Sequence, residues 1–267
     1  MPEGDTIFRT ARTLERAIGG QTVTRFESVL PRLSRVDEDR PLTGRTVEKV
    51  QAQGKWLLIH FSGDLVLLTH MLMSGSWHIY RPGETWQRSR YHMRIVIETP
   101  AMLAVAFNVQ RAEFHSAASL ARREGFNALG PDVLSPDFDE AAAIANLAAR
   151  GEMEVGPALL NQAALAGIGN VFKSEIAFAC GINPFREVAT LTPMDLAELV
   201  ATARKFMRAN VLETSGHIRT TGSTALEKFL WVYRRAGEPC RRCGTPIRTA
   251  KHTADARVTF WCPVCQK

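Results

Sequence analysis

Cys240-Arg-Arg-Cys243, eighteen further residues and then Cys262-Pro-Val-Cys265 form the most diagnostic stretch of this 267-residue chain. Paired Cys-x2-Cys turns of this kind are typical of a tetrahedral site in which four thiolates hold one zinc ion. The shell of such a site is closed, and the 31-residue tail that contains it is too short for an apolar core of its own. We therefore predict one structural Zn2+ ion, bound by Cys240, Cys243, Cys262 and Cys265. The fifth cysteine, Cys180, follows an apolar run and is expected to be a buried thiol.

The zinc module lies in a strongly basic part of the chain. Residues 204–267 contain thirteen Lys or Arg against four Asp or Glu, a charge of +9, so residues 1–203 carry −3 of the total of +6. Such a concentration of positive charge indicates a polyanionic partner. Nucleic acid is favoured over an anionic membrane because no basic amphipathic helix with an aromatic face accompanies the charge. A basic surface that is merely solvated is the alternative.

The overall composition, 45% hydrophobic and 22% charged residues, is that of a globular protein and excludes disordered and collagen-like chains. No apolar run approaches the roughly 18 to 20 residues of a membrane-spanning helix. The first five residues, Met1-Pro-Glu-Gly-Asp5, have neither the basic head nor the apolar stretch of a signal peptide. A cytosolic protein is expected, which agrees with thiols that bind zinc rather than form disulfides.

Upstream of the zinc module the chain is first β-rich and then helical. A helix is expected where apolar residues recur at helical spacing from Ile7 to Ile18, with Asp5 as its cap. Short β-rich runs separated by turn residues then indicate a sandwich or a barrel, at 22–29, 46–52, 56–61, 65–70, 93–99 and 102–107. A polar, Pro-containing stretch at 131–136 breaks this pattern, and helices are expected at 139–149, 168–180, 193–214 and 223–233.

Pro2 and Glu3 are the candidates for chemistry at the N-terminus. Once Met1 is removed, Pro2 is a secondary amine whose pKa lies well below that of lysine, so more of it is unprotonated at neutral pH. Such an amine can attack an electrophilic carbon and form an iminium, while Glu3 moves protons. An ordinary chain terminus without chemistry is the alternative.

Three further positions have both a functional and a plain interpretation. Lys55 opens an apolar strand after Gly54, in a chain with seven lysines against 26 arginines, and is either a pKa-adjustable amine of a site or a strand-edge lysine. Ala166-Gly-Ile-Gly-Asn170 is typical of a tight turn into a helix, whose N-terminus offers a phosphate seat beside Asn170; simple helix packing is the alternative. Met73 is either a core methionine or an apolar wedge for a base stack.

These motifs occur together, and in order, in one family. They are the Pro2-Glu3-Gly4 start, the Gly54-Lys55 strand, the 166–170 turn with Glu175, and the tail from Val232-Tyr-Arg-Arg-Ala-Gly-Glu-Pro-Cys240 to Gln266. The sequence therefore resembles, over essentially its whole length, the formamidopyrimidine-DNA glycosylase and endonuclease VIII family of bacterial base-excision repair enzymes. Each motif is modest alone, but the ordered set is highly specific.

The resemblance implies an α+β, multidomain fold. An N-terminal catalytic β-sandwich with its first helix (1–130) precedes a helix-two-turn-helix DNA-binding domain (131–236) and a four-cysteine zinc finger (237–267). The expected partner is double-stranded DNA that contains oxidised bases or abasic sites, bound by a monomer, with no membrane involved. The expected location is the bacterial cytoplasm, at the nucleoid.

The resemblance also implies roles for individual residues. Pro2 acts as the nucleophile toward the anomeric carbon of the sugar, and Glu3 is its acid/base partner. The implied enzyme is a bifunctional DNA glycosylase and AP lyase, in which a Schiff base at Pro2 leads to β- and then δ-elimination. Lys55 binds a phosphate beside the damaged nucleotide and assists catalysis. Asn170 and Arg257 bind phosphates around the flipped nucleotide. The carboxylate of Glu175 has a supporting role near the site.

Departures from the formamidopyrimidine branch set the expected substrate. Thr6 stands where that branch has its second acidic residue, and Gly4-Asp5-Thr6 follows the endonuclease VIII pattern. The Arg-Arg-Phe segment with which that branch fills the gap left by the flipped base is absent, so Gln110 or Arg111 is expected to take its place. Met73, in contrast, lies in a run that is closer to the formamidopyrimidine pattern. The segment between 216 and 233 is too short for the loop that caps 8-oxoguanine. Oxidised pyrimidines are therefore the predicted substrate; an oxidised-purine glycosylase and a non-catalytic lesion-binding relative are the alternatives.

Overall fold

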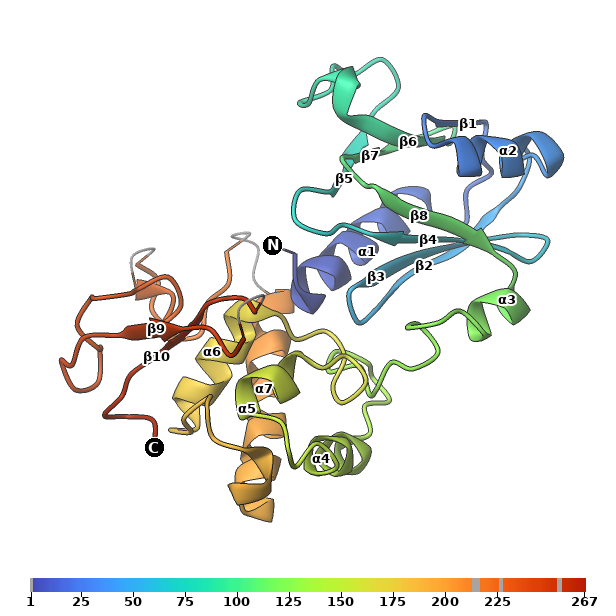
Figure 1. Ribbon diagram of the computed structural model, residues 1–267. Helices are drawn as coiled ribbons and strands as arrows, with labels where there is room; N and C mark the ends of the chain where they lie inside the picture. Colours follow the sequence, from blue (N-terminus) through green and yellow to red (C-terminus); the bar gives the residue numbers. More distant parts are fainter. Residues whose placement is uncertain (1, 213–216, 226–227, 254–255) are drawn as a thin grey trace. The chain divides into compact units, whose positions relative to one another are not determined.

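The computed structural model describes residues 2–212, 217–225, 228–253 and 256–267. The chain divides into two compact units, residues 1–127 and 128–267 (Figure 1). Unit 1 is built around strands, and unit 2 is built from helices with a small hairpin near the C-terminus. The domain boundaries expected after residues 130 and 236 stay predictions.

Unit 1 is a sandwich of two four-stranded antiparallel sheets, with strand orders β1-β6-β7-β5 and β2-β3-β4-β8. The strands of the first sheet are β1 (Arg25–Ser28), β6 (Met93–Glu98), β7 (Leu103–Phe107) and β5 (Ser76–Tyr80). Those of the second sheet are β2 (Val47–Gln53), β3 (Trp56–Phe61), β4 (Leu65–His70) and β8 (Arg111–His115). The helical elements are α1 (Gly4–Ile18), α2 (Pro31–Asp39), the 3-10 turn η1 (Arg90–His92) and α3 (Ala117–Ala121).

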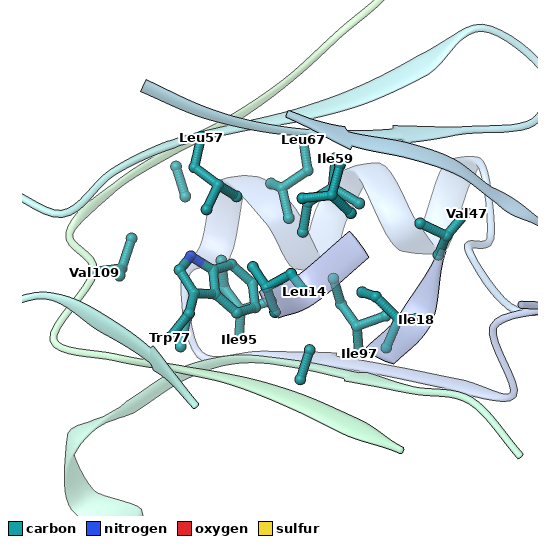
Figure 2. Packing of buried hydrophobic residues seen from close by; sticks show 14 of the residues in the cluster. Leu14, Ile18, Val47, Leu57, Ile59, Leu67, Trp77, Ile95, Ile97 and Val109 are labelled. Atoms are coloured by element: carbon teal, nitrogen blue, oxygen red, sulfur yellow. The ribbon is translucent and has the colours of Figure 1, made fainter. Parts of the chain in front are cut away.

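The core of unit 1 lies between the two sheets and includes one face of α1. Figure 2 shows Leu57 and Leu67 from β3 and β4 on one side, Ile95 of β6 on the other, and Leu14 of α1 among them. Side chains that alternate along the strands, and recur at helical spacing in α1, make this arrangement possible. Full burial of one such side chain contributes about 1.5–3 kcal/mol, so apolar packing is the main source of stability in this unit.

The sandwich is confirmed, and the prediction for the first helix needs one correction. Asp5 does not cap α1, because the N-cap residue is Glu3 and Asp5 lies inside the first turn, fully buried. The sequence interpretation also missed α2, β5 and β8. In α2 only Leu33 is buried and Val36 is partly buried, so the apolar residues are too few for the sequence pattern to indicate a helix.

Unit 2 contains α4 (Glu140–Ala148), α5 (Val155–Leu160), α6 (Asn170–Ala179), the 3-10 turn η2 (Val188–Thr190) and α7 (Pro193–Leu212), followed by the antiparallel hairpin of β9 (Arg248–Ala250) and β10 (Thr259–Trp261). The helix expected at 223–233 is wrong: residues 223–225 and 228–233, which are the described part of that segment, form turns and irregular structure. Backbone N–H groups of residues 231–233 donate to a buried carboxylate, that of Glu175, instead of to helix carbonyls.

Two apolar clusters hold unit 2 together. The larger one joins the helices through residues such as Leu159, Phe172 and Leu199. The smaller one joins Phe178 of α6 to Cys240 and Cys262, so the cysteine module is fixed to α6 by apolar contacts as well. Among the described residues, no helix is both long and apolar enough to cross a membrane.

Candidate active site

The N-terminal segment places Pro2 and Glu3 at the start of α1. Glu3 is the N-cap residue, and its carbonyl oxygen accepts hydrogen bonds from the N–H groups of Thr6 (3.0 Å) and Ile7 (3.1 Å). The Glu3 side chain is fully buried, and Pro2 beside it is half-buried. A buried carboxyl group at the start of a helix is suited to proton transfer at the neighbouring nitrogen of Pro2, which is a free amine only once Met1 is removed.

Asp5 adds a second buried carboxyl group at this end of α1. Burial raises the pKa of Asp5, and the Arg9 guanidinium, 3.3 Å from the carboxylate, opposes the rise. The capping prediction overlooked this group because a carboxylate at a helix start is usually a solvent-exposed cap. The start of α1 therefore presents two acids, of which one is held toward its protonated form by desolvation.

Lys55 lies in the turn that joins β2 to β3. Gln53 pairs with Trp56, so Gly54 and Lys55 form a two-residue hairpin turn, and Gly54 has the positive φ of 57° that glycine adopts without strain. Lys55 is half-buried. Its charge acts on His70: burial, and then the charges of Lys55, Arg111 and Arg123, lower the pKa of His70 to about 4. His70 is therefore neutral at physiological pH, at the edge of a group of cations.

The connection between β4 and β5 carries Met73 at an exposed position. The Met73 side chain is 67% exposed, which removes the alternative of a core methionine. Two hydrogen bonds fix the backbone of this connection: the Leu72 N–H donates to His70 Nδ1 (3.0 Å), and the Gly75 N–H donates to the carbonyl of Met71 (2.8 Å). An apolar side chain presented by a fixed turn is suited to enter a base stack.

Gln110 and Arg111 are both exposed at the start of β8, after Asn108 at a φ of 54°. They line a pocket of about 880 Å³ on unit 1 together with Trp56 and Arg123. Arg111 pairs with His70 across β4 and β8. The structure thus brings two predicted residues, Arg111 and Lys55, close to one histidine.

One wall of this pocket is a salt-bridged stack that sequence interpretation missed. Arg123 makes a two-pronged ion pair with Glu113, with both N–O distances at 2.8 Å, and its guanidinium lies 4.3 Å from the centre of the Trp56 ring. The Arg123 hydrogen bonds, with a smaller contribution from His115, lower the pKa of Glu113 to about 2. The pair fixes Trp56 and Glu113 in place and offsets part of the positive charge of the pocket.

In unit 2, Asn170 is the first residue of α6 and follows the glycine turn. Gly167 has a φ of 104°, and the Gln162 side chain closes the turn by accepting from the Gly167 N–H (3.1 Å) and donating to the Ile168 carbonyl (3.0 Å). The Asn170 side chain is 7% exposed. The N-terminal end of a helix carries partial positive charge, so this placement is suited to a phosphate.

Arg257 is exposed in the segment between β9 and β10. The residue after it is tied to α6, since Asn170 Nδ2 donates to the carbonyl oxygen of Val258 (3.0 Å). The structure therefore brings the backbone next to Arg257 against the helix that begins with Asn170.

Glu175 is a fully buried carboxylate on α6. It accepts hydrogen bonds from the Trp231 N–H (2.8 Å), from the N–H groups of Val232 and Tyr233 (2.9 Å each) and from the Thr220 hydroxyl. Burial raises the pKa of Glu175, and these four donors oppose the rise. Glu175 thus fixes the segment that leads into the cysteine module, which is a supporting position.

The four predicted ligands converge on one point. The Sγ atoms of Cys240, Cys243, Cys262 and Cys265 all lie within 4.8 Å of one another, with 3.5 Å between Cys243 and Cys262 and 3.8 Å between Cys240 and Cys265. A tetrahedral zinc ion with Zn–S bonds of about 2.3 Å places its sulfurs roughly 3.8 Å apart. Disulfides, at about 2 Å, are excluded. The donor set and its spacing fit zinc.

Comparison with known proteins agrees with this arrangement. Family models match residues 1–114 (Formamidopyrimidine-DNA glycosylase N-terminal domain), 129–221 (Formamidopyrimidine-DNA glycosylase H2TH domain) and 237–267 (Zinc finger found in FPG and IleRS). Over its whole length the chain is 40% identical to a probable endonuclease 8 2 of Streptomyces coelicolor and covers 94% of that protein. The chain belongs to the formamidopyrimidine-DNA glycosylase and endonuclease VIII family.

Other relatives extend this result. The DNA-(apurinic or apyrimidinic site) lyase Nei2 of Mycolicibacterium smegmatis is 40% identical over all of this chain and 99% of its own. A crystal structure of inhibited LlFpg with DNA containing N7-benzyl-Fapy-dG superposes with a TM-score of 0.84 at 26% identity, over all of both chains. Fpg of Lactococcus lactis in complex with DNA containing an abasic site gives 0.81 at 25%, over 99% of each chain. The α+β fold, with its sandwich, helix-two-turn-helix domain and zinc finger, is confirmed.

In this member of the formamidopyrimidine-DNA glycosylase and endonuclease VIII family, the structure also adds residues that the sequence interpretation did not use. His70 begins the His-Met-Leu-Met73 run, and its position before Met73 was the available signal. Lys173 lies three residues after Asn170 and so on the same face of α6. The Arg123 stack on Trp56 had no sequence signal, because its partners lie on separate elements.

Proposed function

We propose that this chain is a bifunctional DNA glycosylase and AP lyase of base-excision repair. The observation that carries the proposal is Pro2 directly before the buried carboxyl group of Glu3 at the start of α1. The family membership and the relatives named as endonuclease 8 and as an abasic-site lyase support the same reaction.

In this mechanism the amine of Pro2 attacks the anomeric carbon as the damaged base leaves. The nitrogen gives up its proton, the sugar ring opens, and a Schiff base joins enzyme and DNA. The Schiff base acidifies the neighbouring sugar proton, and its removal expels the first phosphate by β-elimination. Loss of a further sugar proton expels the second phosphate by δ-elimination, and water then hydrolyses the Schiff base and frees the Pro2 amine. Glu3 transfers protons during ring opening and elimination.

Residues of both units hold the DNA in this proposal. Lys55 and Arg257 bind phosphates next to the damaged nucleotide, and the amide of Asn170 at the start of α6 binds another. Met73 enters the space left by the flipped base, and Gln110 or Arg111 contacts the opposite strand. The structures of relatives with lesion-containing and abasic DNA support a DNA duplex as partner.

Oxidised pyrimidines are the proposed substrate. The absence of the Arg-Arg-Phe segment and the short segment between 216 and 233 support this choice. So do the identities to proteins named endonuclease 8 2, 38–40%, and endonuclease 8, 32%, against 26% to LlFpg. Excision of thymine glycol and 8-oxoguanine from matched duplexes tests it: faster removal of 8-oxoguanine would replace this substrate with oxidised purines.

Borohydride trapping on an abasic-site duplex tests the reaction. We expect a covalent complex that peptide mass spectrometry maps to Pro2, and no complex when Met1 is retained or the amine is acetylated. Glu3→Gln should slow trapping about 10²- to 10⁴-fold, whereas Glu140→Gln, an exposed acid at the start of α4, should not. Tight lesion binding without any trapped complex would favour the non-catalytic lesion-binding relative.

Three further points belong to this proposal: one zinc ion per chain, a monomer, and action in the bacterial cytoplasm at the nucleoid. The four-cysteine cluster supports a single ion. Metal analysis and light scattering of the purified protein test the first two points; two metal ions per chain or a stable dimer would contradict them. The bacterial relatives support the third, which fluorescence microscopy of a tagged chain tests.

A further inference from the structure

We propose that His252, Thr259 and Lys173 form a positioning relay that sets the Asn170 amide and the segment carrying Arg257, and so controls the grip on the phosphates beside the lesion. The inference rests on the proposed function, since it concerns residues to which phosphate binding is assigned there. The relay consists of buried side chains of unit 2 that take no direct part in the chemistry.

The first link fixes the orientation of the Asn170 amide. Lys173 Nζ donates to Asn170 Oδ1 (2.8 Å), while Asn170 Nδ2 donates to the carbonyl oxygen of Val258 (3.0 Å). A lysine ammonium only donates, so it assigns the amide oxygen to its own side. The amide nitrogen has a second N–H, which is the donor that a phosphate oxygen requires.

The second link joins this lysine to the hairpin. Lys173 is fully buried, and Nζ also donates to Thr259 Oγ1 (2.6 Å). Burying an ammonium is costly unless polar groups surround it, and an apolar residue of similar length would serve packing alone. A lysine at this place therefore indicates a need for its donors, and Thr259 lies only two residues after Arg257.

The third link joins His252, at the other end of the segment that carries Arg257, to the start of α5. His252 Nε2 is 2.8 Å from Thr259 Oγ1, and His252 Nδ1 contacts the carboxylate of Glu154, the N-cap residue of α5. The Phe185 ring stacks on the imidazole with centroids 4.5 Å apart. His252 is thus held by hydrogen bonds at both ring nitrogens and by a stacked ring.

The donors and acceptors of these links fit only one direction. The carboxylate of Glu154 only accepts, so His252 Nδ1–H is the donor in that contact, and burial lowers the pKa of His252, so Nε2 of the neutral ring accepts the Thr259 hydroxyl hydrogen while Thr259 Oγ1 accepts from Lys173. The chain of bonds runs from Lys173 through Thr259 and His252 to Glu154. It fixes residues 252 and 259 at the two ends of the segment that contains Arg257, while Lys173 also fixes Asn170.

A double-mutant cycle tests the relay through binding to a duplex with a tetrahydrofuran abasic analogue. We expect Asn170→Ala and Lys173→Met each to raise Kd about tenfold, and the double variant to raise it no further than the stronger single change. In Lys173→Met the trapped amount at saturating abasic DNA should stay near that of the wild type, because this lysine positions Asn170 and does not take part in the chemistry. Lys49→Met, an exposed lysine of β2, gives the matched control, which should be additive with Asn170→Ala.

The result that overturns the relay is an additive double variant, about a hundredfold weaker, or a Lys173→Met protein with unchanged Kd. Where Lys173→Met fails to fold or lacks zinc, Thr259→Val replaces it in the cycle, with the same expected non-additivity. Failure of the proposed function has a separate signature, the absence of any borohydride-trapped complex with the wild-type chain, whereas an additive cycle in a chain that traps abasic DNA removes the relay alone.

Discussion

The two units hold their proposed functional residues by different means. In unit 1, Glu3 and Lys55 lie at the end of a helix and in the turn of a hairpin, and a large apolar core stabilises both elements. In unit 2, the Asn170 side chain accepts a hydrogen bond from the buried Lys173, and Arg257 lies between residues 252 and 259, whose side chains are hydrogen-bonded to each other. Apolar packing therefore stabilises the elements that carry the proposed site residues of unit 1, whereas hydrogen bonds between buried polar groups hold the proposed phosphate-binding residues of unit 2.

Packing and polar bonds respond differently to a single change. Removal of one apolar side chain leaves the rest of a large cluster in place, with a graded loss. Removal of one partner from a buried polar group leaves the other partner unsatisfied, and several contacts are lost together. We therefore expect the loss of one buried polar partner in unit 2 to disturb the proposed phosphate-binding segment more than the loss of one apolar side chain disturbs the proposed site residues of unit 1.

Loss of zinc should have the largest effect and should separate the two units most clearly. Zinc-finger peptides gain roughly 10–16 kcal/mol of apparent binding energy from the metal. We expect Cys262→Ser, or chelation, to weaken binding to abasic-analogue DNA at least about tenfold, because the segment that carries Arg257 loses its support. Near-ultraviolet circular dichroism of unit 1 aromatics should persist. Full DNA affinity in a metal-free protein would contradict this order of effects.

Glu175→Gln should have the next largest effect. A glutamine side chain offers one acceptor oxygen where the carboxylate accepts four hydrogen bonds, so buried N–H groups of residues 231–233 lose partners. The expected loss is about 2–4 kcal/mol in the unfolding of unit 2, measured by urea denaturation. Glu140→Gln, on an exposed site of α4, is the matched control and should change little. An equal change in both variants would mean that Glu175 does not fix this segment.

The contrast between the units also explains what the sequence could predict. Short β-rich runs bounded by turn residues, such as 56–61 and 65–70, predicted the sandwich, and the helical spacing of apolar residues up to Ile18 predicted its first helix. Cysteine spacing predicted the metal cluster in the same way, since the ligands of one site follow a fixed pattern.

What could not be predicted depends on contacts between distant residues. More than fifty positions separate Glu175 from residues 231–233, and the same is true of Lys173 and Thr259. No local sequence pattern predicts a contact between residues so far apart. The helix predicted at 223–233 failed for this reason, as its backbone donors serve Glu175. Asp5 was misjudged as a cap because burial of a helix start is a tertiary property.

Mild acid should lower the free energy of unfolding of unit 1 through His70, by about 1.4 kcal/mol one pH unit below the ordinary histidine pKa. Its folded pKa of about 4 lies below the ordinary value of 6.5, so between these values the unfolded chain binds a proton that the folded chain does not. This contribution to stability is complete above about pH 6.5 and falls by up to about 1.4 kcal/mol per pH unit toward pH 4. Protonation also removes the acceptor that His70 Nδ1 offers to the Leu72 N–H.

His70→Gln should flatten this part of the stability curve, as followed by urea unfolding at several pH values. His217→Gln, at an exposed position of unit 2, should leave the slope of unit 1 in place. An unchanged slope in the His70 variant would assign the acid sensitivity of unit 1 to other groups.

The smallest expected effect concerns salt, and it tests whether both units share the phosphates. Each phosphate contact adds about −0.9 to the slope of log affinity against log salt. Lys55→Met and Arg257→Met should each reduce the slope by about one, whereas Asn170→Ala should weaken binding at an unchanged slope because an amide carries no charge. Residues 204–267 carry +9 and residues 1–203 carry −3, so net charge alone would assign the whole slope to the C-terminal part. A reduced slope in Lys55→Met would show that Lys55 binds a DNA phosphate although it lies in the part of the chain with net negative charge. An unchanged slope would mean that Lys55 does not bind a phosphate and acts only in the chemistry.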